Sequence, residues 1–403
     1  MGWQRTIALI GMMLVAAVMW DLPVLDRIIV ALVVLFIICW YWNKTALAGL
    51  GIERTVLMDR VNVGDTMVEE ITVTNFSRLP KLWVELSDHS TLPGHNAHSV
   101  VSLRGRGRSS WNVQTAAERR GRYRLGPILA SAGDPVGMFT SDVTLPVSHE
   151  ILVFPARIDV SGISLPTAQL SGGRVAPRNT LMTTASVSSV RDYAPGDPMN
   201  RIAWSATARR GQLMVKEFEP DPTADLWILL DLNDDGQFDL QQRQDLPPEY
   251  RHLNTTVEYI ISIGASLANV ALAQGRRVGV ILNREEPIRL EPDNSERQSF
   301  RIAETLAVVT SSGSRSLTES LAADARKFSR TSGLVVITAD PRSDWVAAGA
   351  ALVERLVPVT AVIVDAGGDG PDDIDPLMTR LARARVNVHR YPTITGMIKR
   401  EKQ

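Results

Sequence analysis

Acidic and amide side chains follow directly after one strongly apolar segment of the chain. Residues 226–230 read Leu-Trp-Ile-Leu-Leu, and the run Asp231-Leu-Asn-Asp-Asp235 comes next. Positions i, i+2 and i+4 of such a run can direct oxygen atoms into one small volume, and oxygen is the ligand atom that Mg²⁺, Mn²⁺ and Ca²⁺ prefer. Asp340, which follows the apolar residues 334–338, can join them. The sequence therefore predicts a site for one divalent cation at Asp231, Asn233, Asp235 and Asp340, with Thr310 and Thr318 as additional candidate donors.

Three other interpretations of this run compete with the metal site. Asp231-x-Asn-x-Asp-Gly236 matches the first half of an EF-hand loop, but an EF-hand needs a preceding helix and a glutamate at position twelve. A strand-like segment precedes this run and Gln242 stands at position twelve, so the sequence excludes an EF-hand. The run could also be an acidic loop that binds no metal. In the third interpretation Asp231, Asp235 and Asp340 serve a metal-dependent hydrolase, although the sequence offers no clear general base.

Other motifs favour a protein without catalytic activity. The sequence contains no G-x-S-x-G, P-loop or H-E-x-x-H motif. His89, His95 and His98 are close enough in the chain to supply two or three zinc ligands. The neighbouring Gly94 and Asn96 favour a solvated turn instead, so we do not expect zinc.

Length, charge and cysteine content narrow the class of protein. A chain of 403 residues predicts two or three domains. The net charge of −1, with both signs well mixed, argues against nucleic acid as a partner. The single cysteine, Cys39, lies in an apolar run, so the soluble part has neither disulfides nor a cysteine zinc site.

Two uncharged runs near the N-terminus, residues 6–20 and 28–42, predict a transmembrane helical hairpin within residues 1–45. Residues 21–27 carry Pro23 and three charges and mark the turn. Tryptophan and tyrosine at the ends of the runs suit a membrane interface. A cleaved signal peptide would explain the first run but not the second. We therefore expect the lipid bilayer to contact residues 6–42 of a multi-pass cell-membrane protein.

The basic residues around the hairpin predict its orientation. Arg5, Lys44 and Arg54 flank the outer ends, whereas the turn carries only Arg27. Because cytoplasmic segments are enriched in lysine and arginine, we expect both termini and the soluble part in the cytoplasm.

Hydrophobic periodicity divides the soluble part. Residues 51–155 alternate apolar and polar side chains in short segments, which predicts an all-β, Ig-like sandwich. Residues 156–223 hold a Gly/Pro/Ser/Thr-rich linker and a distinctive segment discussed below. Residues 224–395 alternate apolar strands, at 226–230, 278–282, 334–338, 359–364 and 386–390, with amphipathic helical patterns. Such alternation predicts a parallel sheet covered by helices on both faces.

Residues 190–218, here called the signature segment, carry a family resemblance. They contain Arg-Asp-Tyr-Ala-Pro-Gly-Asp, Ile-Ala-Trp and Ala-Arg-Arg-Gly-Gln-Leu, and the chain also has Arg-Arg-Gly-Arg-Tyr-Arg-Leu-Gly at 119–126 and Asp-Pro-Val-Gly-Met-Phe at 134–139. The chain resembles the bacterial family called "domain of unknown function 58". That family usually has an acidic residue where Ala203 stands.

The resemblance implies a membrane-tethered protein with a von Willebrand factor A-like, Rossmann-like C-terminal domain. It also implies a neighbouring gene for a MoxR-type AAA+ ATPase or a transglutaminase-like protein. Within the signature segment we expect structural or interaction roles for Arg191, Tyr193, Gly196, Asp197, Arg201, Trp204 and Arg209. The arginines would clamp carboxylates between domains or bind a partner, and Trp204 and Phe218 would lie in the core or between domains.

These observations predict a membrane-anchored scaffold or adaptor. Its von Willebrand A-like domain would bind a protein partner, with a MoxR-type ATPase as the candidate, in a cation-dependent or a cation-independent manner. A metal-dependent hydrolase and a structural envelope protein without a metal site are the alternatives.

Overall fold

The computed structural model describes residues 23–166, 187–194, 202–218, 225–240, 253–365 and 374–393, with five isolated positions before residue 23. The chain divides into two compact units, Met1–Phe154 and Pro155–Gln403. Each unit has its own apolar core.

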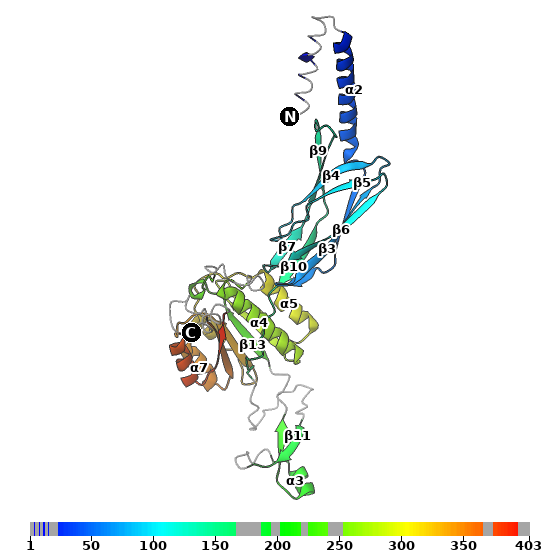
Figure 1. The fold of residues 1–403 in the computed structure, drawn as a ribbon. Coiled ribbons are helices and arrows are strands. Elements are labelled where there is room, and N and C mark those ends of the chain that lie inside the picture. The colour runs from blue at the N-terminus through cyan, green and yellow to red at the C-terminus, as the bar shows by residue number, and fades with distance from the viewer. Residues whose placement is uncertain are drawn as a thin grey trace, which may run out of the picture. The chain divides into compact units, whose positions relative to one another are not determined.

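An apolar helix, α2 (Pro23–Ala46), opens the first unit (Figure 1). Its segment Asp26–Ala46 has a mean hydropathy of 1.9, and only 6% of it is buried. The helix begins at Pro23, because proline is well suited to the first helical turn, so the turn predicted at 21–27 is partly helical. The first predicted span, residues 6–20, lies mostly outside the described residues.

A second helix, α4 (Thr256–Ala273), is also long and apolar enough to cross a membrane. It is 61% buried and packs in the core of the second unit. Two such helices are weak indications of membrane association.

The remainder of the first unit is rich in β-structure. Its strands are β1 (Leu50–Val56), β2 (Arg60–Asn62), β3 (Thr66–Asn75), β4 (Lys81–Asp88), β5 (Ser99–Leu103), β6 (Arg108–Ala116), β7 (Gly121–Leu125), β8 (Ile128–Gly133), β9 (Thr140–Leu145) and β10 (His149–Phe154). They form three sheets, ordered β1-β3-β6, β5-β4-β8-β9 and β2-β10-β7. Alternate side chains of the first two sheets build one shared core, as the period-two pattern predicted.

The second unit centres on a mixed six-stranded sheet. Its strands are β13 (Leu226–Asp231), β14 (Val278–Asn283), β15 (Ile288–Asp293), β16 (Gly333–Thr338), β17 (Val359–Asp365) and β18 (Asn387–Pro392). The order is β15-β14-β13-β16-β17-β18, and all except β15 are parallel. The prediction of a parallel sheet missed this antiparallel edge strand, whose half-polar sequence lacks the apolar run of a central strand.

Helices cover both faces of this sheet, as predicted. On one face α4 and α5 (Glu296–Val308) pack with alternate strand residues such as Ile228 and Leu230. On the other face α6 (Leu317–Asp324), α7 (Val346–Glu354) and α8 (Asp375–Arg383) pack against Leu229 and its neighbours. Fully buried strands explain the continuous apolar runs in the sequence.

Residues 155–166 form an irregular segment of this second unit, with a turn at residues 161–163. Val160 and Ile163 join its core. The Pro166 carbonyl accepts a hydrogen bond from Arg276, and Ser164 Oγ lies 2.9 Å from His389 Nε2. The start of the predicted linker is therefore an ordered part of this unit.

Candidate functional site

The predicted acidic residues gather where neighbouring parallel strands end. β13 ends at Asp231, which lies opposite Asn283 at the end of β14. On the other side of β13, β16 ends at Thr338, and Asp340 follows two residues later. Because these strands run in the same direction, their last residues meet at one edge of the sheet, here called the carboxyl edge. Edges of this kind commonly bind ligands in α/β proteins.

Asp231 is held by neutral donors in a buried position. Only 1% of its surface is exposed. Its Oδ1 accepts a hydrogen bond from Asn283 Nδ2 at 2.9 Å, and its Oδ2 accepts one from Thr338 Oγ1 at 2.8 Å. Burial raises the pKa of Asp231 to about 6 despite these hydrogen bonds, and the nearby charge of Asp340 adds to the rise.

A guanidinium group supplies the positive charge at the carboxyl edge. Arg342 Nη2 and Nε each lie 2.7 Å from Asp340 Oδ2, and Nε lies 3.0 Å from Oδ1. The hydrogen bonds to Asp340 raise the pKa of Arg342, and the charges of Asp344 and Asp235 act in the same direction. The Arg342 side chain is 52% exposed, so this cation faces both the carboxylates and the solvent.

The loop after β13 lies against Asp340. It contains a single 3₁₀ turn, η2 (Asp234–Gly236), in which Asn233 Oδ1 accepts a hydrogen bond from the Asp235 N–H. A Cβ on Gly236 would lie 2.8 Å from the Asp340 Cβ, so only glycine allows this approach. Asn233 and Asp340 are buried, whereas Asp235 is exposed at the rim.

A third loop, residues 311–316, closes the network. The Arg315 carbonyl accepts hydrogen bonds from Asn233 Nδ2 at 3.2 Å and Asn283 Nδ2 at 3.0 Å. The Asp234 N–H donates to the Gly313 carbonyl at 3.0 Å. Three loops from distant parts of the chain are thus fixed to one another.

This donor set fits a divalent cation poorly in its present arrangement. Both oxygens of Asp231 and both oxygens of Asp340 already accept hydrogen bonds from protein donors. The Arg342 guanidinium would also repel a divalent ion beside Asp340. In the part of the chain that the structure describes, no three His, Cys, Asp or Glu side chains gather closely enough to hold a metal. Cation binding stays a prediction and requires Arg342 to leave Asp340.

The hydrolase interpretation meets a similar obstacle. A catalytic carboxylate must reach the substrate or a bound water. Asp231 is 1% exposed and Asp340 is 7% exposed. Asp235 is the one predicted carboxylate of this set that solvent reaches freely.

Sequence reasoning named Asp231, Asn233 and Asp340, which the structure brings together, but it missed part of their network. The missed residues are Asn283, Thr338 and Arg342. The threonine that reaches Asp231 is Thr338, and neither Thr310 nor Thr318 does so. Asn283 and Thr338 could have been found, because each is the last residue of an apolar strand, as Asp231 is.

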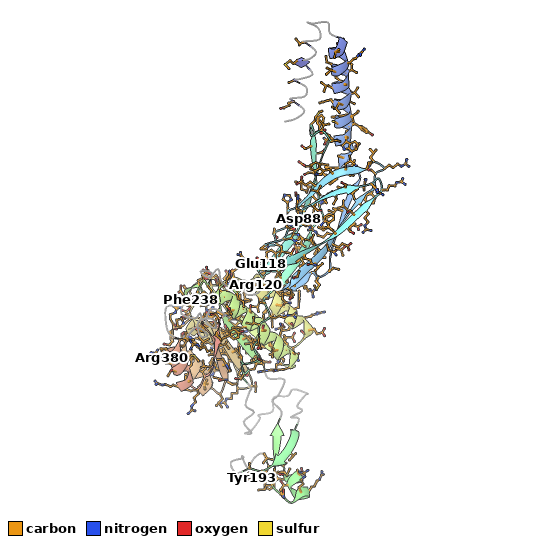
Figure 2. The ribbon with its side chains drawn as sticks, viewed as in Figure 1. Asp88, Glu118, Arg120, Tyr193, Phe238 and Arg380 are labelled. Carbon is orange, nitrogen blue, oxygen red and sulfur yellow. The ribbon has the colours of Figure 1, made fainter. Side chains whose placement is uncertain are left out.

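The predicted histidine turn lies elsewhere, in the first unit, and contains a buried ion cluster. Arg54 Nη2 lies 2.9 Å from Asp88 Oδ1, and Arg54 Nε lies 3.2 Å from Glu69 Oε2. His95 Nε2 lies 2.8 Å from Asp88 Oδ2, and all four side chains are at most 3% exposed (Asp88 is labelled in Figure 2). The prediction of a solvated turn is therefore wrong for His95, although His89 and His98 are exposed.

The charges of this cluster balance. Burial alone would lower the pKa of His95, but hydrogen bonds to Asp88 and Glu69 outweigh burial and raise it to about 9. Burial alone would raise the pKa of Asp88, but His95, Ser90 and Arg54 lower it to about 2. At neutral pH two positive and two negative groups thus neutralise one another.

The signature segment forms a hairpin with a short helix. β11 (Val187–Asp192) pairs antiparallel with β12 (Met214–Phe218), and α3 (Trp204–Arg210) lies between them in the chain. Arg191 lies in β11, and the Tyr193 N–H donates to the Leu213 carbonyl at 2.9 Å. Arg209 is exposed on α3. The remaining predicted positions, Gly196, Asp197 and Arg201, lie outside the described residues.

Comparison with known proteins agrees with these motifs. Residues 189–366 match the profile of a family described as "Protein of unknown function DUF58". These residues form a DUF58 region. It contains the signature segment and the carboxyl-edge residues Asp231 and Asp340.

One curated relative supports this assignment. The chain is 24% identical over 169 residues to the uncharacterized protein YeaD of Bacillus subtilis strain 168. The match covers 42% of this chain and 38% of YeaD, so the chain spans well under half of that relative.

Solved structures give no further guidance to the DUF58 region. The CARDB domain of PF1109 from Pyrococcus furiosus matches with a TM-score of 0.20 and 18% identity, over 26% of this chain and 94% of that chain. A beta-glucosidase from Listeria innocua matches with a TM-score of 0.17 and 12% identity, over 26% and 16% of the two chains. Both scores are too low to support an argument about fold or function.

Trp204 and Phe218 of the DUF58 region were expected to lie in the core or between domains. Trp204 is 66% exposed, so it does not lie in the core, and the alternative place between domains stays a prediction. The Phe218 side chain lies outside the described part.

Ala203, where the resemblance implies an acidic residue, is the N-cap of α3 and makes no side-chain capping bond. An acidic side chain there would accept a hydrogen bond from the first turn of α3, which alanine cannot do.

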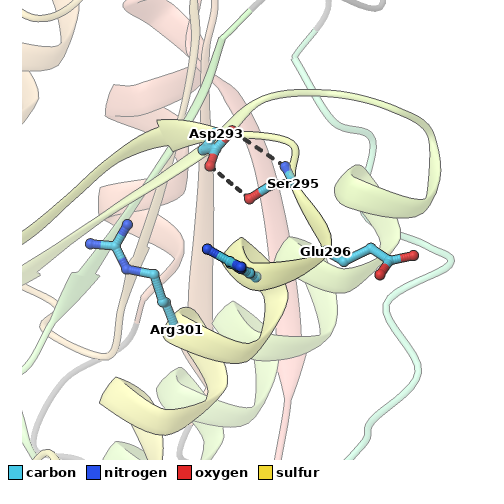
Figure 3. Close-up of a pocket in the computed structure, with 5 residues that line it drawn as sticks. Asp293, Ser295, Glu296 and Arg301 are labelled. Atoms are coloured by element: carbon cyan, nitrogen blue, oxygen red, sulfur yellow. Dashed lines mark hydrogen bonds between the residues drawn. The ribbon is translucent and has the colours of Figure 1, made fainter.

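A shallow pocket in the DUF58 region lies at the opposite edge of the sheet. It is lined by Asp293, Ser295, Glu296, Arg297 and Arg301, at the start of α5 (Figure 3). The Asp293 carboxylate accepts hydrogen bonds from the Ser295 hydroxyl and N–H. Asp293 pairs with Val278 at the amino end of β14, so the pocket is separate from the network around Asp231.

Proposed function

We propose that this chain is a membrane-anchored adaptor that binds a protein partner through its carboxyl edge. α2 would cross the bilayer, together with a second helix formed by the run at residues 6–20. The β-rich part would be an Ig-like sandwich, and the second unit would be a von Willebrand A-like domain. The strand order and the acidic residue at the end of the first central strand support this fold assignment.

The ion pair between Arg342 and Asp340 carries the proposal. The Arg342 side chain is half exposed, and Asp235 and Asp344 are further charged neighbours. Hydrogen bonds join the loop after β13, the end of β14 and the 311–316 loop to one another. A rigid array of exposed charges suits recognition of a protein partner, because little conformational entropy is lost on binding.

The proposal has a cation-dependent and a cation-independent form. The occupied oxygens of Asp231 and Asp340 favour the second, in which Arg342 takes the place of a metal as the positive centre. The first form needs a conformational change that releases Asp340 from Arg342. A MoxR-type AAA+ ATPase in the cytoplasm is the candidate partner, on the basis of the family resemblance.

The test is direct binding of the full chain, reconstituted in lipid nanodiscs, to a MoxR-type ATPase encoded in the same genome. We expect saturable binding that Arg342→Gln weakens at least tenfold and that EDTA leaves unchanged. Arg108→Gln is a matched control, since it removes an exposed arginine of the first unit. Binding that EDTA abolishes would establish the cation-dependent form. Equal binding by wild type and Arg342→Gln would contradict the role of the carboxyl edge.

A further inference from the structure

The turn between β8 and β9, residues 134–139, lies alongside α2 (Figure 1). The Phe139 ring meets the Phe36 ring edge to face, with a centroid separation of 5.2 Å. Two residues further on, Ser141 Oγ donates to the Asn43 carbonyl at 3.2 Å and lies 2.7 Å from Asn43 Oδ1. The turn is thus attached to the helix at two levels.

These contacts place the turn deep along the helix. Phe36 precedes Asn43 by seven residues, which corresponds to about 10 Å along a helix axis. Trp40 and Tyr41, which suit a membrane interface, lie between those two levels. If α2 spans the bilayer, the turn therefore extends past the interfacial aromatic residues toward the hydrocarbon region.

The composition of the turn suits such a position. It reads Asp-Pro-Val-Gly-Met-Phe, and Asp134, its one charged residue, is only 7% exposed. Val136 at the tip is 55% exposed. The turn thus presents apolar groups outward and keeps its charge inside.

Most backbone N–H groups of the turn are paired within the turn itself. Asp134 Oδ2 accepts from the Val136 N–H, and its Oδ1 accepts from the Phe139 N–H. The Gly137 N–H donates to the Asp134 carbonyl, and the Asp134 N–H donates to the Phe139 carbonyl. Pro135 has no N–H to satisfy. Each unpaired backbone polar group is costly at membrane depth, so this pairing lowers the cost of bringing the turn there.

The helix side of the contact is also distinctive. Cys39, one turn beyond Phe36, is 2% exposed, whereas only 6% of the apolar window of α2 is buried. α2 is therefore covered at Cys39 and at its C-terminal end, where Ala46 is 7% exposed, while most of the helix is open.

We propose that the 134–139 turn inserts into the lipid bilayer beside α2 and forms a second membrane contact. This inference rests on the proposed membrane anchoring by α2. The insertion would hold the β-rich part of the first unit close to the membrane surface. Lipid acyl chains are the partner, and Val136 is the residue that meets them.

Site-directed spin labelling of the full chain in phosphatidylcholine/phosphatidylglycerol nanodiscs tests the proposal. Each variant carries one cysteine in a Cys39→Ala background, at Val136, Val143, Val34 or Glu118. Val34 is 49% exposed on α2, and Glu118 follows β6 at the end of the β-rich part away from α2 (Figure 2). The measured quantity is the ratio of spin-label collision with oxygen, which dissolves in lipid, to collision with a water-soluble nickel chelate.

We expect the ratio at Val136 to be several-fold higher than at Glu118 and to approach that at Val34. The ratio at Val143, further along β9 from the tip, should be intermediate. A low ratio at Val136 with a high ratio at Val34 would overturn the insertion of the turn and leave the anchoring intact. Low ratios at both would overturn the anchoring and the insertion together.

Discussion

Arg342 Nη2 lies 2.7 Å from Asp340 Oδ2, so a residue of the chain itself provides the cation at the carboxyl edge. The Asp340 N–H donates to Thr338 Oγ1 at 3.0 Å, and Thr338 Oγ1 donates to Asp231 at 2.8 Å. The exposed guanidinium is therefore connected to the buried carboxylate through two residues. A change at Arg342 acts on the whole network.

Removing the Arg342 charge should create a divalent cation site. In Arg342→Gln, Asp340 and Asp231 keep two negative charges without a counter-charge, and a Mg²⁺ ion can enter. Calorimetric titration of the full chain in detergent should show saturable Mg²⁺ binding for the variant and at least tenfold weaker binding for the wild type. Arg380→Gln serves as the control, since that arginine bonds the nearby Ser343 hydroxyl instead of a predicted ligand. Equally tight binding by the wild type would show that Arg342 does not block the site.

Titration of Asp231 should make the second unit less stable as the pH rises. Its pKa of about 6 in the folded chain lies above the value of 3.8 for a free side chain, so folding favours the protonated form. The contribution of Asp231 to the free energy of unfolding is fully present below about pH 4. It falls by about 3 kcal/mol as the pH rises through about 6, at 1.36 kcal/mol per pKa unit. Hydrogen exchange of the β13 and β14 amides measures this loss of stability.

The matched variant is Asp231→Asn, which cannot titrate. The difference in free energy of unfolding between wild type and variant should decrease between pH 4 and pH 6. A difference that is independent of pH would mean that Asp231 keeps an ordinary pKa.

Arg54→Met should strongly destabilise the first unit. It leaves Glu69 and Asp88 buried with only His95 as a positive partner. Removing one member of a buried ion cluster typically costs 3–5 kcal/mol. The hydrogen exchange of the β3 and β4 amides should accelerate accordingly.

Arg108→Met is the control for that experiment. Arg108 faces Glu53 at 3.7 Å, and both side chains are more than 60% exposed. An exposed pair contributes at most about 1 kcal/mol. Similar losses of stability in both variants would show that the buried cluster stabilises the first unit no more than an exposed ion pair does.

Ala203→Asp should stabilise α3. The new carboxylate can accept a hydrogen bond at the N-terminus of the helix and interact favourably with the helix dipole, together about 1 kcal/mol. Slower hydrogen exchange of the 204–210 amides would register the gain, and Ala203→Val, which cannot cap, should show no such gain. Faster exchange in Ala203→Asp would indicate that the buried position, 3% exposed, has no room for a carboxylate.

Much of the fold follows from local patterns in the sequence. The apolar runs at 226–230, 334–338 and 359–364 are strands buried on both faces, and residues 67–74 alternate as a half-buried strand. Asp231 and Asp340 were found because each follows such a run. Burial of alternate or successive side chains is a property of neighbouring residues, so periodicity reveals it.

Other features depend on which distant segments meet. The pairing of Arg342 with Asp340 needs the backbone geometry of the loop after β16, and Thr338 reaches Asp231 only because β13 and β16 are neighbours in register. His95 looked like part of a solvated turn because its partners, Glu69 and Asp88, lie on two other strands.

By itself, the sequence determined the apolar helix, the strand and helix pattern, the DUF58 motifs and the acidic residues at the strand ends. Only the tertiary structure decided that Arg342 is the positively charged partner of Asp340 at the carboxyl edge. It also decided that β15 is antiparallel and that the 134–139 turn lies along α2. The physical reason is that hydrophobic periodicity acts over a few residues. Ion pairs and side-chain contacts between distant segments are set by strand register and loop geometry, which no local pattern contains.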